Sequence, residues 1–297
     1  MQTGARFALI VNPSAGAGRA RELLPEVQRA LAARHLDHRV VHTEDIEHGI
    51  AAAREAVAAG EIPAAMSGDG MIGQIGGALA GTGATLGIVP GGRGNDLARV
   101  LRIPREPDGA VSVLAAGATR EIDVGEANGR RFLGIASCGF DSDANRLANE
   151  VTIVRGNLVY LYAALRALAA WRPARFELGL DGERHAFRGY SVAAANSKAY
   201  GGGMYAAPSA ELDDGLLEVV WCEDLPKLRF LFTALPRVFK GTHVELDEVT
   251  VRRAGEVEIA ADRPFAVYAD GDHLTDLPAT VRLLPRALRV LAPPSAG

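Results

Sequence analysis

The sequence has few cysteines and few lysines, and both shortages limit the classes of protein to which it can belong. Among 297 residues only Cys138 and Cys222 are present, which is too few for a disulfide framework, and they form no Cys-x-x-Cys pair. Lysine occurs only at Lys198, Lys227 and Lys240, and the 32 basic residues face 36 acidic ones, giving a net charge of −4. This balance leaves no global basic footprint for a nucleic-acid partner, and we expect none.

Long hydrophobic runs are also missing. The longest, over residues 158–171, is interrupted by Arg166 and falls short of the ~20 apolar residues that a membrane span needs. The first residues show no apolar region and cleavage site of a secretory signal. With the low cysteine count, these features predict a cytoplasmic protein. A composition of 48% hydrophobic and 23% charged residues is typical of a folded globular chain.

Strand and helix patterns alternate in the first part of the chain. Glycine-rich turns follow three of the expected strands, at residues 12–18, 67–70 and 90–96. Strand, glycine turn and helix in repetition predict a parallel sheet with crossover helices. Ligands of such sheets bind beyond the carboxyl ends of the strands, where these turns lie. The expected strands are 7–11, 39–42, 63–66 and 85–89, and the expected helices are 19–33, 46–59, 70–79 and one from about 97.

The pattern changes from about residue 121 onward. Short strand-like runs separated by turns predict a β-rich, antiparallel second domain. A last run, 280–291, fits a strand that returns to either domain. The expected strands are 131–136, 176–180, 183–195, 216–221, 249–259 and 265–269, with helices over 157–171 and 225–239.

The glycine turns favour an anionic ligand, because a turn before a helix directs backbone N–H groups and the positive end of the helix dipole at one point. No Gly-Lys pair occurs, so a GxxxxGK[ST] loop is excluded, and Gly16-x-Gly18 lacks the third glycine of a dinucleotide fingerprint. Asp69 and Asp96 lie in two of the turns, where carboxylates could serve Mg²⁺ and a phosphoryl acceptor. The alternative is a purely structural role, in which the glycines only make tight turns and the aspartates only cap helices.

Several segments, taken in order, resemble the diacylglycerol kinase catalytic-domain family, the lipid kinases that include bacterial diacylglycerol kinases, sphingosine kinases and ceramide kinases. VNPSAG (11–16) resembles its NPxSG element, SGDG (67–70) its GGDG signature, and GIVPGGRGNDLAR (87–99) its PxGTGNDxAR segment. The resemblance covers nearly the whole chain. Landmarks of the second domain follow at 123–125, 139–141, 196–208, 213–219 and 270–272.

The resemblance implies an α/β nucleotide-binding domain with a parallel sheet, like that of NAD kinases and diacylglycerol kinases, followed by a β-sandwich domain. Residues 1–122 would form the ATP-binding catalytic domain and residues 123–279 the substrate domain, with a strand in 280–297 returning to the first. The implied enzyme is an ATP- and Mg²⁺-dependent lipid kinase. It would transfer the γ-phosphoryl group to a hydroxyl of a diacylglycerol-like or long-chain lipid. Its partners would be ATP and a lipid at the inner membrane face, where the protein would bind peripherally, and a homodimer is left open.

The same resemblance assigns residues to roles. The catalytic residues would be Asp270, as general base, with Asp69 and Asp272. The acceptor would meet Asp96 and Asp141. Mg²⁺ would be held by Asp69 and Asp96, and a structural Mg²⁺ by Glu211, Asp214 and the Leu216 carbonyl. The nucleotide would be bound by Asn12, Pro13, Ser14, Gly16, Ser67, Gly68, Gly70, Gly91, Gly92, Arg93, Gly94 and Asn95.

Four departures from the family pattern keep two alternatives open. GGDGT reads SGDGM here, GTGND reads GRGND, and the DGE element reads DGD; Gly73 stands at a position where the family has asparagine. One alternative is a kinase for a soluble hydroxyl such as that of NAD. The other is a catalytically silent regulator that binds nucleotide or lipid.

Two apolar segments also have two interpretations. Residues 158–171 and 225–239 carry leucines and aromatics at helical spacing with scattered basic residues. They either cap the core of the second domain or, as the lipid-kinase resemblance suggests, line an acyl-chain cleft or lie on the bilayer interface.

Overall fold

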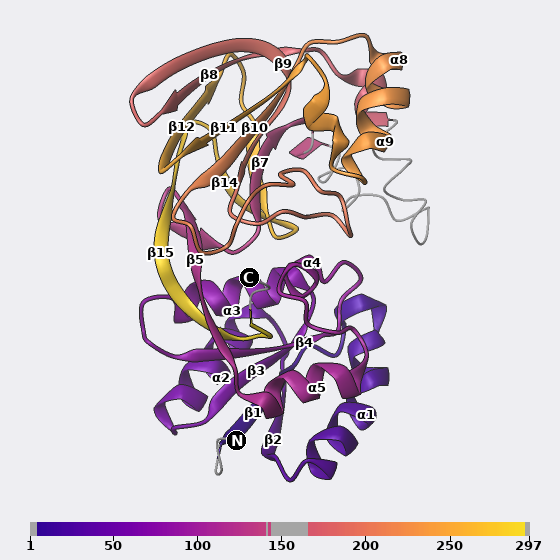
Figure 1. Cartoon of the computed structure of the whole chain (residues 1–297), viewed down its shortest axis with the longest axis vertical. Helices are drawn as coiled ribbons and strands as arrows, with labels where there is room; N and C mark the ends of the chain where they lie inside the picture. The colour runs from indigo at the N-terminus through magenta and orange to yellow at the C-terminus, as the bar shows by residue number, and fades with distance from the viewer. Residues whose placement is uncertain (1–4, 141, 144–165, 295–297) are drawn as a thin grey trace.

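The computed structural model describes residues 5–140, 142–143 and 166–294. Two domains lie end to end (Figure 1), the first α/β with parallel strands and the second a β-sandwich. The expected fold class is therefore confirmed.

The first domain follows the predicted alternation. Its sheet has the order β2-β1-β3-β4 with every neighbour parallel. β1 forms because five consecutive apolar residues, Phe7 to Val11, are buried on both faces of the sheet. α2 begins where the Asp45 carboxylate accepts a hydrogen bond from the His48 amide at 2.7 Å. The elements are β1 (Arg6–Val11), η1 (Ala15–Ala17), α1 (Arg19–Ala33), β2 (Asp37–His42), α2 (Ile46–Ala58), β3 (Ile62–Ser67), α3 (Asp69–Leu79), β4 (Thr85–Pro90), α4 (Asp96–Val100) and α5 (Pro107–Ala116).

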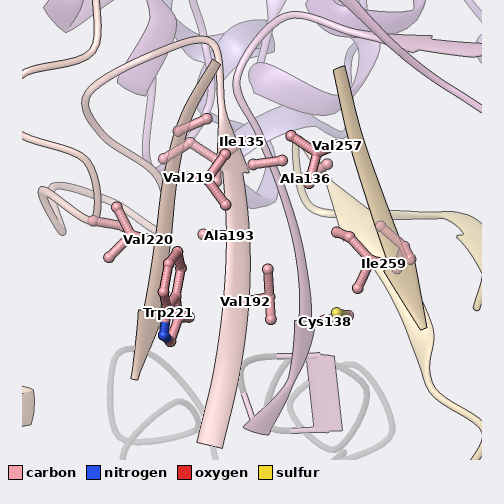
Figure 2. Packing of buried hydrophobic residues seen from close by; sticks show 14 of the residues in the cluster. Ile135, Ala136, Cys138, Val192, Ala193, Val219, Val220, Trp221, Val257 and Ile259 are labelled. Atoms are coloured by element: carbon pink, nitrogen blue, oxygen red, sulfur yellow. The ribbon is translucent and has the colours of Figure 1, made fainter. Parts of the chain in front are cut away.

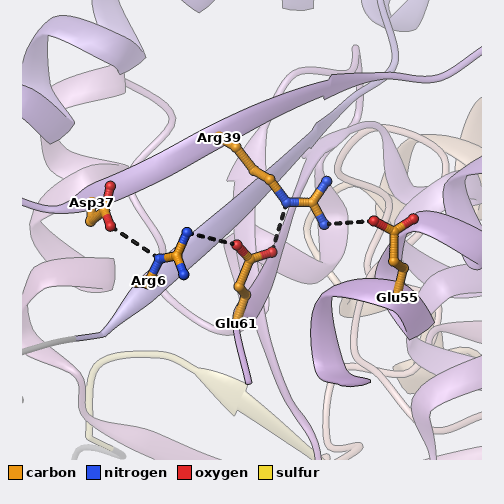
Figure 3. Close-up of polar contacts among 5 residues, drawn as sticks. All are labelled: Arg6, Asp37, Arg39, Glu55 and Glu61. Carbon is orange, nitrogen blue, oxygen red and sulfur yellow. Dashed lines mark hydrogen bonds and ion pairs between the residues drawn. The ribbon is translucent and has the colours of Figure 1, made fainter. Parts of the chain in front are cut away.

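The amino-terminal edge of this sheet is held by ion pairs (Figure 3). Glu61, whose side chain is only 5% exposed, contacts Arg6 at 3.6 Å and Arg39 at 2.7 Å. Arg6 also pairs with Asp37, and Arg39 with Glu55. The glycine turns follow the opposite ends of the strands, so the network stabilises the sheet at the edge away from them.

The second domain is antiparallel, as predicted. Two predicted strands are wrong in extent, because each is broken in two. The run 131–136 divides into β6 and β7, with Leu133 and Gly134 between them, and the run 249–259 divides into β11 and β12. The elements are β5 (Thr119–Ala127), β6 (Arg130–Phe132), β7 (Ile135–Gly139), β8 (Ala174–Leu180), β9 (Glu183–Ala195), β10 (Leu217–Glu223), α8 (Lys227–Arg229), η2 (Phe230–Ala234), α9 (Leu235–Val238), η3 (Thr242–Glu245), β11 (Val249–Ala254), β12 (Glu256–Ala261), β13 (Ala266–Ala269), β14 (Asp272–Asp276) and β15 (Ala279–Leu291).

The second break lies at Gly255, where a distant side chain binds the backbone. The Asp181 carboxylate accepts hydrogen bonds from the amides of Gly255 and Glu256, at 3.0 and 2.9 Å, so these amides are turned away from a continuous ladder. On either side the chain then pairs with different neighbours. β11 pairs with β10, whereas β12 pairs with β8 and β15.

Two long strands, β5 and β15, connect the domains (Figure 1). They pair antiparallel with each other over most of their length. The first part of β15 pairs with β12 of the sandwich, and its end pairs in parallel with β4, Arg289 opposite Thr85. The final strand therefore belongs to both sheets. β5 and α5 were not among the predicted elements.

Figure 2 shows part of the core of the sandwich, with buried side chains from four of its strands. Ile135 of β7, Val192 of β9, Val219 of β10 and Ile259 of β12 are all at most 2% exposed. A separate core fills the first domain, and Leu133 and Leu288, from the second domain and the connecting strand, pack into it. Each domain therefore buries its own apolar surface, and α3 lies where the two meet.

The predicted helix over 225–239 is present as one continuous helical segment, α8–η2–α9. Its middle turn is widened, because the Leu235 amide donates to the Phe230 carbonyl five residues earlier. Of the helix expected over 157–171, residues 157–165 lie outside the described residues. In the described part of the chain, no helix is both long and apolar enough to span a bilayer.

Candidate active site

The three glycine turns meet at the carboxyl edge of the parallel sheet, as the alternating pattern predicts. A Cβ atom on Gly16 would lie 2.6 Å from the Gly91 carbonyl oxygen, and one on Gly92 would lie 2.4 Å from Gly68 Cα. Neither distance is compatible with a side chain. The glycines therefore do more than turn the chain, since they let three backbone segments come into contact with one another.

Two asparagines shape these turns with their side chains. Asn12 Oδ1 accepts a hydrogen bond from the Ser14 amide at 3.0 Å. Asn95 is buried at φ +53°, and its side chain bonds both the amide and the carbonyl of Gly92, at 2.8 and 2.9 Å. The asparagine of the GRGND segment thus closes its own loop. Arg93 in the same loop is exposed, and its carbonyl accepts from Arg105.

Asp69 and Asp96 lie on either side of Gly94. A Cβ atom there would stand 3.0 Å from Asp69 Oδ2 and 3.1 Å from Asp96 Oδ2. Asp69 Oδ1 accepts from the Leu97 amide at 3.1 Å, and Asp96 Oδ2 accepts from the Gly202 amide at 2.6 Å. Each carboxylate thereby holds one oxygen in a backbone hydrogen bond.

The surroundings of the Asp96 carboxyl disfavour its charged form. Burial raises its pKa, and the neighbouring charge of Asp69 adds to the rise, while the Gly202 amide and the Arg99 guanidinium oppose it. Arg99 stands 3.8 Å from Asp96 Oδ1. Among the described residues this buried oxygen has no hydrogen-bond partner. An oxygen in that situation is suited to a cation or a donor from a ligand.

Asp270 reaches this place from the second domain. It lies in the turn between β13 and β14 at φ +54°, and it accepts hydrogen bonds from the amides of Leu133 and Gly134 at 2.8 and 2.9 Å. These are the two residues at which β6 and β7 separate. Burial raises the pKa of its carboxyl to about 7, and the charges of Asp69 and Asp272 contribute further to the rise against the two amide hydrogen bonds.

Helix α3 of the first domain comes close to these carboxylates because two of its residues are glycines. A Cβ atom on Gly73 would stand 2.5 Å from Asp270 Oδ2, and one on Gly70 would stand 2.8 Å from Asp272 Oδ2. Burial also raises the pKa of Asp272. Arg131 closes the carboxyl end of α3 by donating to the carbonyls of Gly77 and Ala80. The contact between the domains therefore aligns Asp270 and Asp272 with the start of α3, where Asp69 lies.

Some residues that support the site have no recognisable signal of their own in the sequence. The Gly202 amide bonds Asp96, and the Leu133 and Gly134 amides bond Asp270. Asn196 donates from Nδ2 to the carbonyls of Asp123 and Leu133, at 2.9 Å each, and so fixes the Leu133 peptide. The family landmark 196–208 contains Asn196 and Gly202, but not Leu133 or Gly134.

The remaining predicted residues lie elsewhere. Asp214 is paired with Arg253 and accepts from the Leu216 amide, in a loop whose Gly215 amide donates to Asp123. Glu211 is exposed in the same loop. Asp141 lies outside the described residues. The other predicted nucleotide residues, Pro13, Ser67 and Gly68, belong to the turns already described.

The site's fit for a divalent cation rests on Asp69 and Asp96. Within the described ranges, no three His, Cys, Asp or Glu side chains are close enough together to form a metal cluster of their own. Mg²⁺ usually keeps several waters and takes only one or two carboxylates, with substrate phosphates completing its shell. Two adjacent carboxylates fit that requirement, since one has a buried oxygen that makes no hydrogen bond within the described part of the chain.

Comparison with known proteins places the whole chain in one family. Residues 6–127 match the diacylglycerol kinase catalytic domain, and residues 134–292 match the YegS C-terminal NAD kinase beta sandwich-like domain. A diacylglycerol kinase of Mycobacterium tuberculosis is 36% identical over 97% of this chain and 95% of its own length. A diacylglycerol kinase of Bacillus subtilis is 27% identical over 97% of this chain and 96% of its own.

The fold is shared with solved structures as well. A crystal structure of a diacylglycerol kinase from Bacillus anthracis superimposes with a TM-score of 0.76 at 20% identity, covering all of both chains. This chain belongs to the diacylglycerol kinase catalytic-domain family. The expected enzyme class, a phosphotransferase with an alcohol acceptor, is thereby confirmed, and ATP use is implied by a kinase family.

Proposed function

We propose that this chain is an ATP- and Mg²⁺-dependent lipid kinase. It transfers the γ-phosphoryl group of ATP to a hydroxyl of a diacylglycerol-like or long-chain lipid, at the membrane surface on the cytoplasmic side. The observation that carries this proposal is the meeting of Asp69 and Asp96, from the first domain, with Asp270 and Asp272, from the second, at the start of α3. The silent-regulator alternative is disfavoured by this arrangement, because four aspartates from the two domains meet at one place.

The nucleotide would bind along the glycine turns. Their backbone amides would receive the phosphate groups, with the turn from Asn12 to Gly16 and the one from Ser67 to Gly70 facing each other across Gly91 and Gly92. Asp69 and Asp96 would hold Mg²⁺, which when bound neutralises phosphate charge that develops during transfer. Arg93, exposed at the rim of the loop, is available to pair with a phosphate oxygen.

Asp270 would be the general base. With a pKa near 7, its carboxylate is a stronger proton acceptor than an ordinary aspartate and is still available in the charged form near neutral pH. It would take the proton of the acceptor hydroxyl while that oxygen forms a bond to the γ-phosphorus. The bond from this phosphorus to the β,γ-bridging oxygen breaks, and ADP leaves. Asp272 keeps a second negative charge near Asp270 and helps to maintain its basicity.

The structural Mg²⁺ site at Glu211, Asp214 and the Leu216 carbonyl stays a prediction. Asp214 already bonds the guanidinium of Arg253, so a cation there would have to displace or share that contact. The assignment of Asp141 to the acceptor also stays a prediction.

The test uses γ-labelled ATP, Mg²⁺ and vesicles that contain diacylglycerol. We expect label in the organic extract with the native protein and a loss of roughly a hundredfold or more for Asp270→Asn, the size of a general-base contribution. Asp69→Asn should lose activity and weaken the Mg²⁺ dependence of ATP binding. Asp37→Asn, an exposed aspartate at the far edge of the sheet, is the control and should retain full activity.

Two results would contradict the proposal. Label on a soluble acceptor such as NAD, with none in lipid, would identify the soluble-acceptor kinase. ATP binding without transfer to any hydroxyl acceptor would identify a silent regulator.

A further inference from the structure

The helical segment of the second domain carries most of the exposed large apolar side chains. We call residues 225–242 the docking segment. Among the described residues, four large hydrophobic side chains are exposed, and three of them lie on it: Leu228 at 71%, Phe232 at 73% and Phe239 at 55%. The fourth, Ile46 at 37%, begins α2 in the other domain. Such clustering within about three helical turns differs from the scattered apolar residues of an ordinary surface.

The side of the docking segment that faces the sandwich is packed into the core, so the exposure of its other side is not a sign of loose packing. Phe230 is 6% exposed and stacks on Tyr190 with ring centroids 4.2 Å apart and planes at 5°. It also meets Phe140 edge to face at 4.9 Å. The Tyr190 hydroxyl donates to the Leu225 carbonyl, and Ala234 is buried on the same side. With Phe230 and Ala234 held in the core, the helix cannot rotate to bury Phe232.

The charge of the segment indicates what covers this face. Residues 225–242 contain no Asp or Glu but four basic residues, Lys227, Arg229, Arg237 and Lys240, in a chain whose net charge is −4. Two of the chain's three lysines are among them. Arg229 is neutralised by Glu248, and Lys227 donates to the Ala169 carbonyl. The positive charge of the other two, half-buried Arg237 and exposed Lys240, flanks Phe239.

Apolar and cationic side chains together on one solvent-facing helix are the pattern of an interfacial membrane segment. The aromatic and leucine side chains would enter the headgroup region, and the basic side chains would meet anionic lipid. We propose that the docking segment seats the protein on an anionic lipid bilayer, with Leu228, Phe232 and Phe239 inserted and Arg237 and Lys240 at the headgroups. It lies at the edge of the sandwich, in orange in Figure 1. This proposal deepens the proposed function, on which it rests for the location of the acceptor.

The docking segment is also connected to the candidate active site. The Tyr205 amide donates to the Val238 carbonyl at 2.9 Å, and His243 just beyond the segment contacts the Ala206 carbonyl at 3.1 Å. The same loop supplies the Gly202 amide that bonds Asp96 at 2.6 Å. A bilayer bound at the segment would therefore be joined to the phosphoryl-transfer carboxylates through the loop of residues 198–208.

Vesicle cosedimentation of the full chain tests the proposal. Phosphatidylcholine vesicles are compared with vesicles of phosphatidylcholine and phosphatidylglycerol in equal parts. We expect the native protein to prefer the anionic vesicles. The double variant Leu228→Ser/Phe232→Ser should bind at least about tenfold more weakly, because two large side chains no longer leave water. Arg237→Gln/Lys240→Gln should bind roughly tenfold more weakly to the anionic vesicles alone.

Matched controls come from the first domain. Ile46→Ser and Arg54→Gln change an exposed apolar and an exposed basic residue, and each should change vesicle affinity by less than about twofold. A kinase assay with a short-chain diacylglycerol dissolved in water should give the same kcat for the docking variants and the native protein. A loss of vesicle binding with unchanged kcat in water supports docking and excludes misfolding.

Binding to anionic vesicles that is unchanged in both double variants would overturn the proposal, whether or not lipid is phosphorylated. Sedimentation velocity could give a second result that overturns the proposal. If the native protein is a dimer that Phe232→Ser dissociates, and if it does not bind vesicles, this face contacts a second copy of the chain. Vesicle binding that depends on the segment, with no kinase activity on any lipid, would instead retain docking and refute the proposed function.

Discussion

Asp270 lies directly against Gly73, although the two residues come from different domains. A Cβ atom on Gly73 would stand 2.5 Å from Asp270 Oδ2, and Asp270 holds its place by accepting from the Leu133 and Gly134 amides. The absence of a side chain at Gly73 therefore leaves room for the carboxylate. The position of the proposed base is set by the two amide hydrogen bonds, in space that Gly73 of helix α3 leaves open.

A methyl group at Gly73 should displace this carboxylate. We expect Gly73→Ala to lower kcat at least about tenfold, because sub-ångström displacement of a general base is costly. The unfolding free energy should change much less, since alanine favours a helix by about 1 kcal/mol over glycine and offsets part of the crowding. Steady-state kinetics and thermal unfolding measure the two effects. Gly49→Ala, where the nearest atom is the flexible Met71 sulfur at 3.3 Å, is the control. An unchanged kcat in Gly73→Ala would show that Asp270 need not be where it lies.

Activity should depend on pH through Asp270. A general base must be deprotonated, so we expect kcat/KM to rise with pH and to level off above a pKa of about 7. In Asp270→Asn the remaining activity should lack this rising limb. A full pH profile of both proteins is the measurement. A limb that persists unchanged in the variant would assign the titration to another group.

Asp270 should also make the stability of the fold depend on pH. Activity is expected to rise with pH, whereas the contribution of Asp270 to stability should fall. The Asp270 pKa is raised from about 3.9 in an unfolded chain to about 7 in the folded protein. Between these values the folded state binds more protons than the unfolded state, so this residue's contribution to the unfolding free energy falls as pH rises. We therefore expect the unfolding free energy of Asp270→Asn to increase relative to that of the native protein as the pH is raised from 5 to 8. Urea unfolding at several pH values measures the difference, and a constant difference would contradict the raised pKa.

Asp123 should be essential for stability. Its fully buried carboxylate accepts hydrogen bonds from the Gly215 and Arg286 amides, both at 2.7 Å. Asp123→Ala leaves two donors without partners, and we expect the unfolding free energy to fall by at least about 2 kcal/mol. Asp181→Ala is the matched control, because that exposed carboxylate also accepts from two amides but water can replace it. Equal losses in urea unfolding would show that burial of the Asp123 contacts contributes nothing.

The ion pairs at the far edge of the sheet should affect stability alone. Glu61→Gln removes the negative charge between Arg6 and Arg39, and we expect a loss of about 1–3 kcal/mol in unfolding free energy with kcat unchanged. Asp37→Asn breaks only an exposed pair with Arg6 and should cost less than about 1 kcal/mol. A fall in kcat for Glu61→Gln would mean that the two edges of the sheet are coupled.

Much of the first domain could be predicted because its signals are local. The apolar run of β1, the glycine turns after β1, β3 and β4, and the helices between them follow from side-chain periodicity and backbone freedom over a few residues. The family motifs then indicated which turns carry Asp69 and Asp96. The prediction was less accurate where the chain breaks for a distant partner. The strand expected over 131–136 is interrupted at Leu133 and Gly134, because their amides bond Asp270, more than a hundred residues away.

The sequence by itself determined that this is a two-domain kinase of the diacylglycerol kinase family with glycine turns and aspartates at one sheet edge. Only the tertiary structure decided how those aspartates differ. Burial between the domains raises the pKa of Asp270 to about 7, and one buried oxygen of Asp96 has no hydrogen-bond partner among the described residues. The division of 249–259 into two strands with different neighbours and the sharing of β15 by both domains were likewise decided by long-range pairing. Solvent exclusion and hydrogen bonds between distant segments depend on which surfaces meet, and no local pattern of residues specifies that.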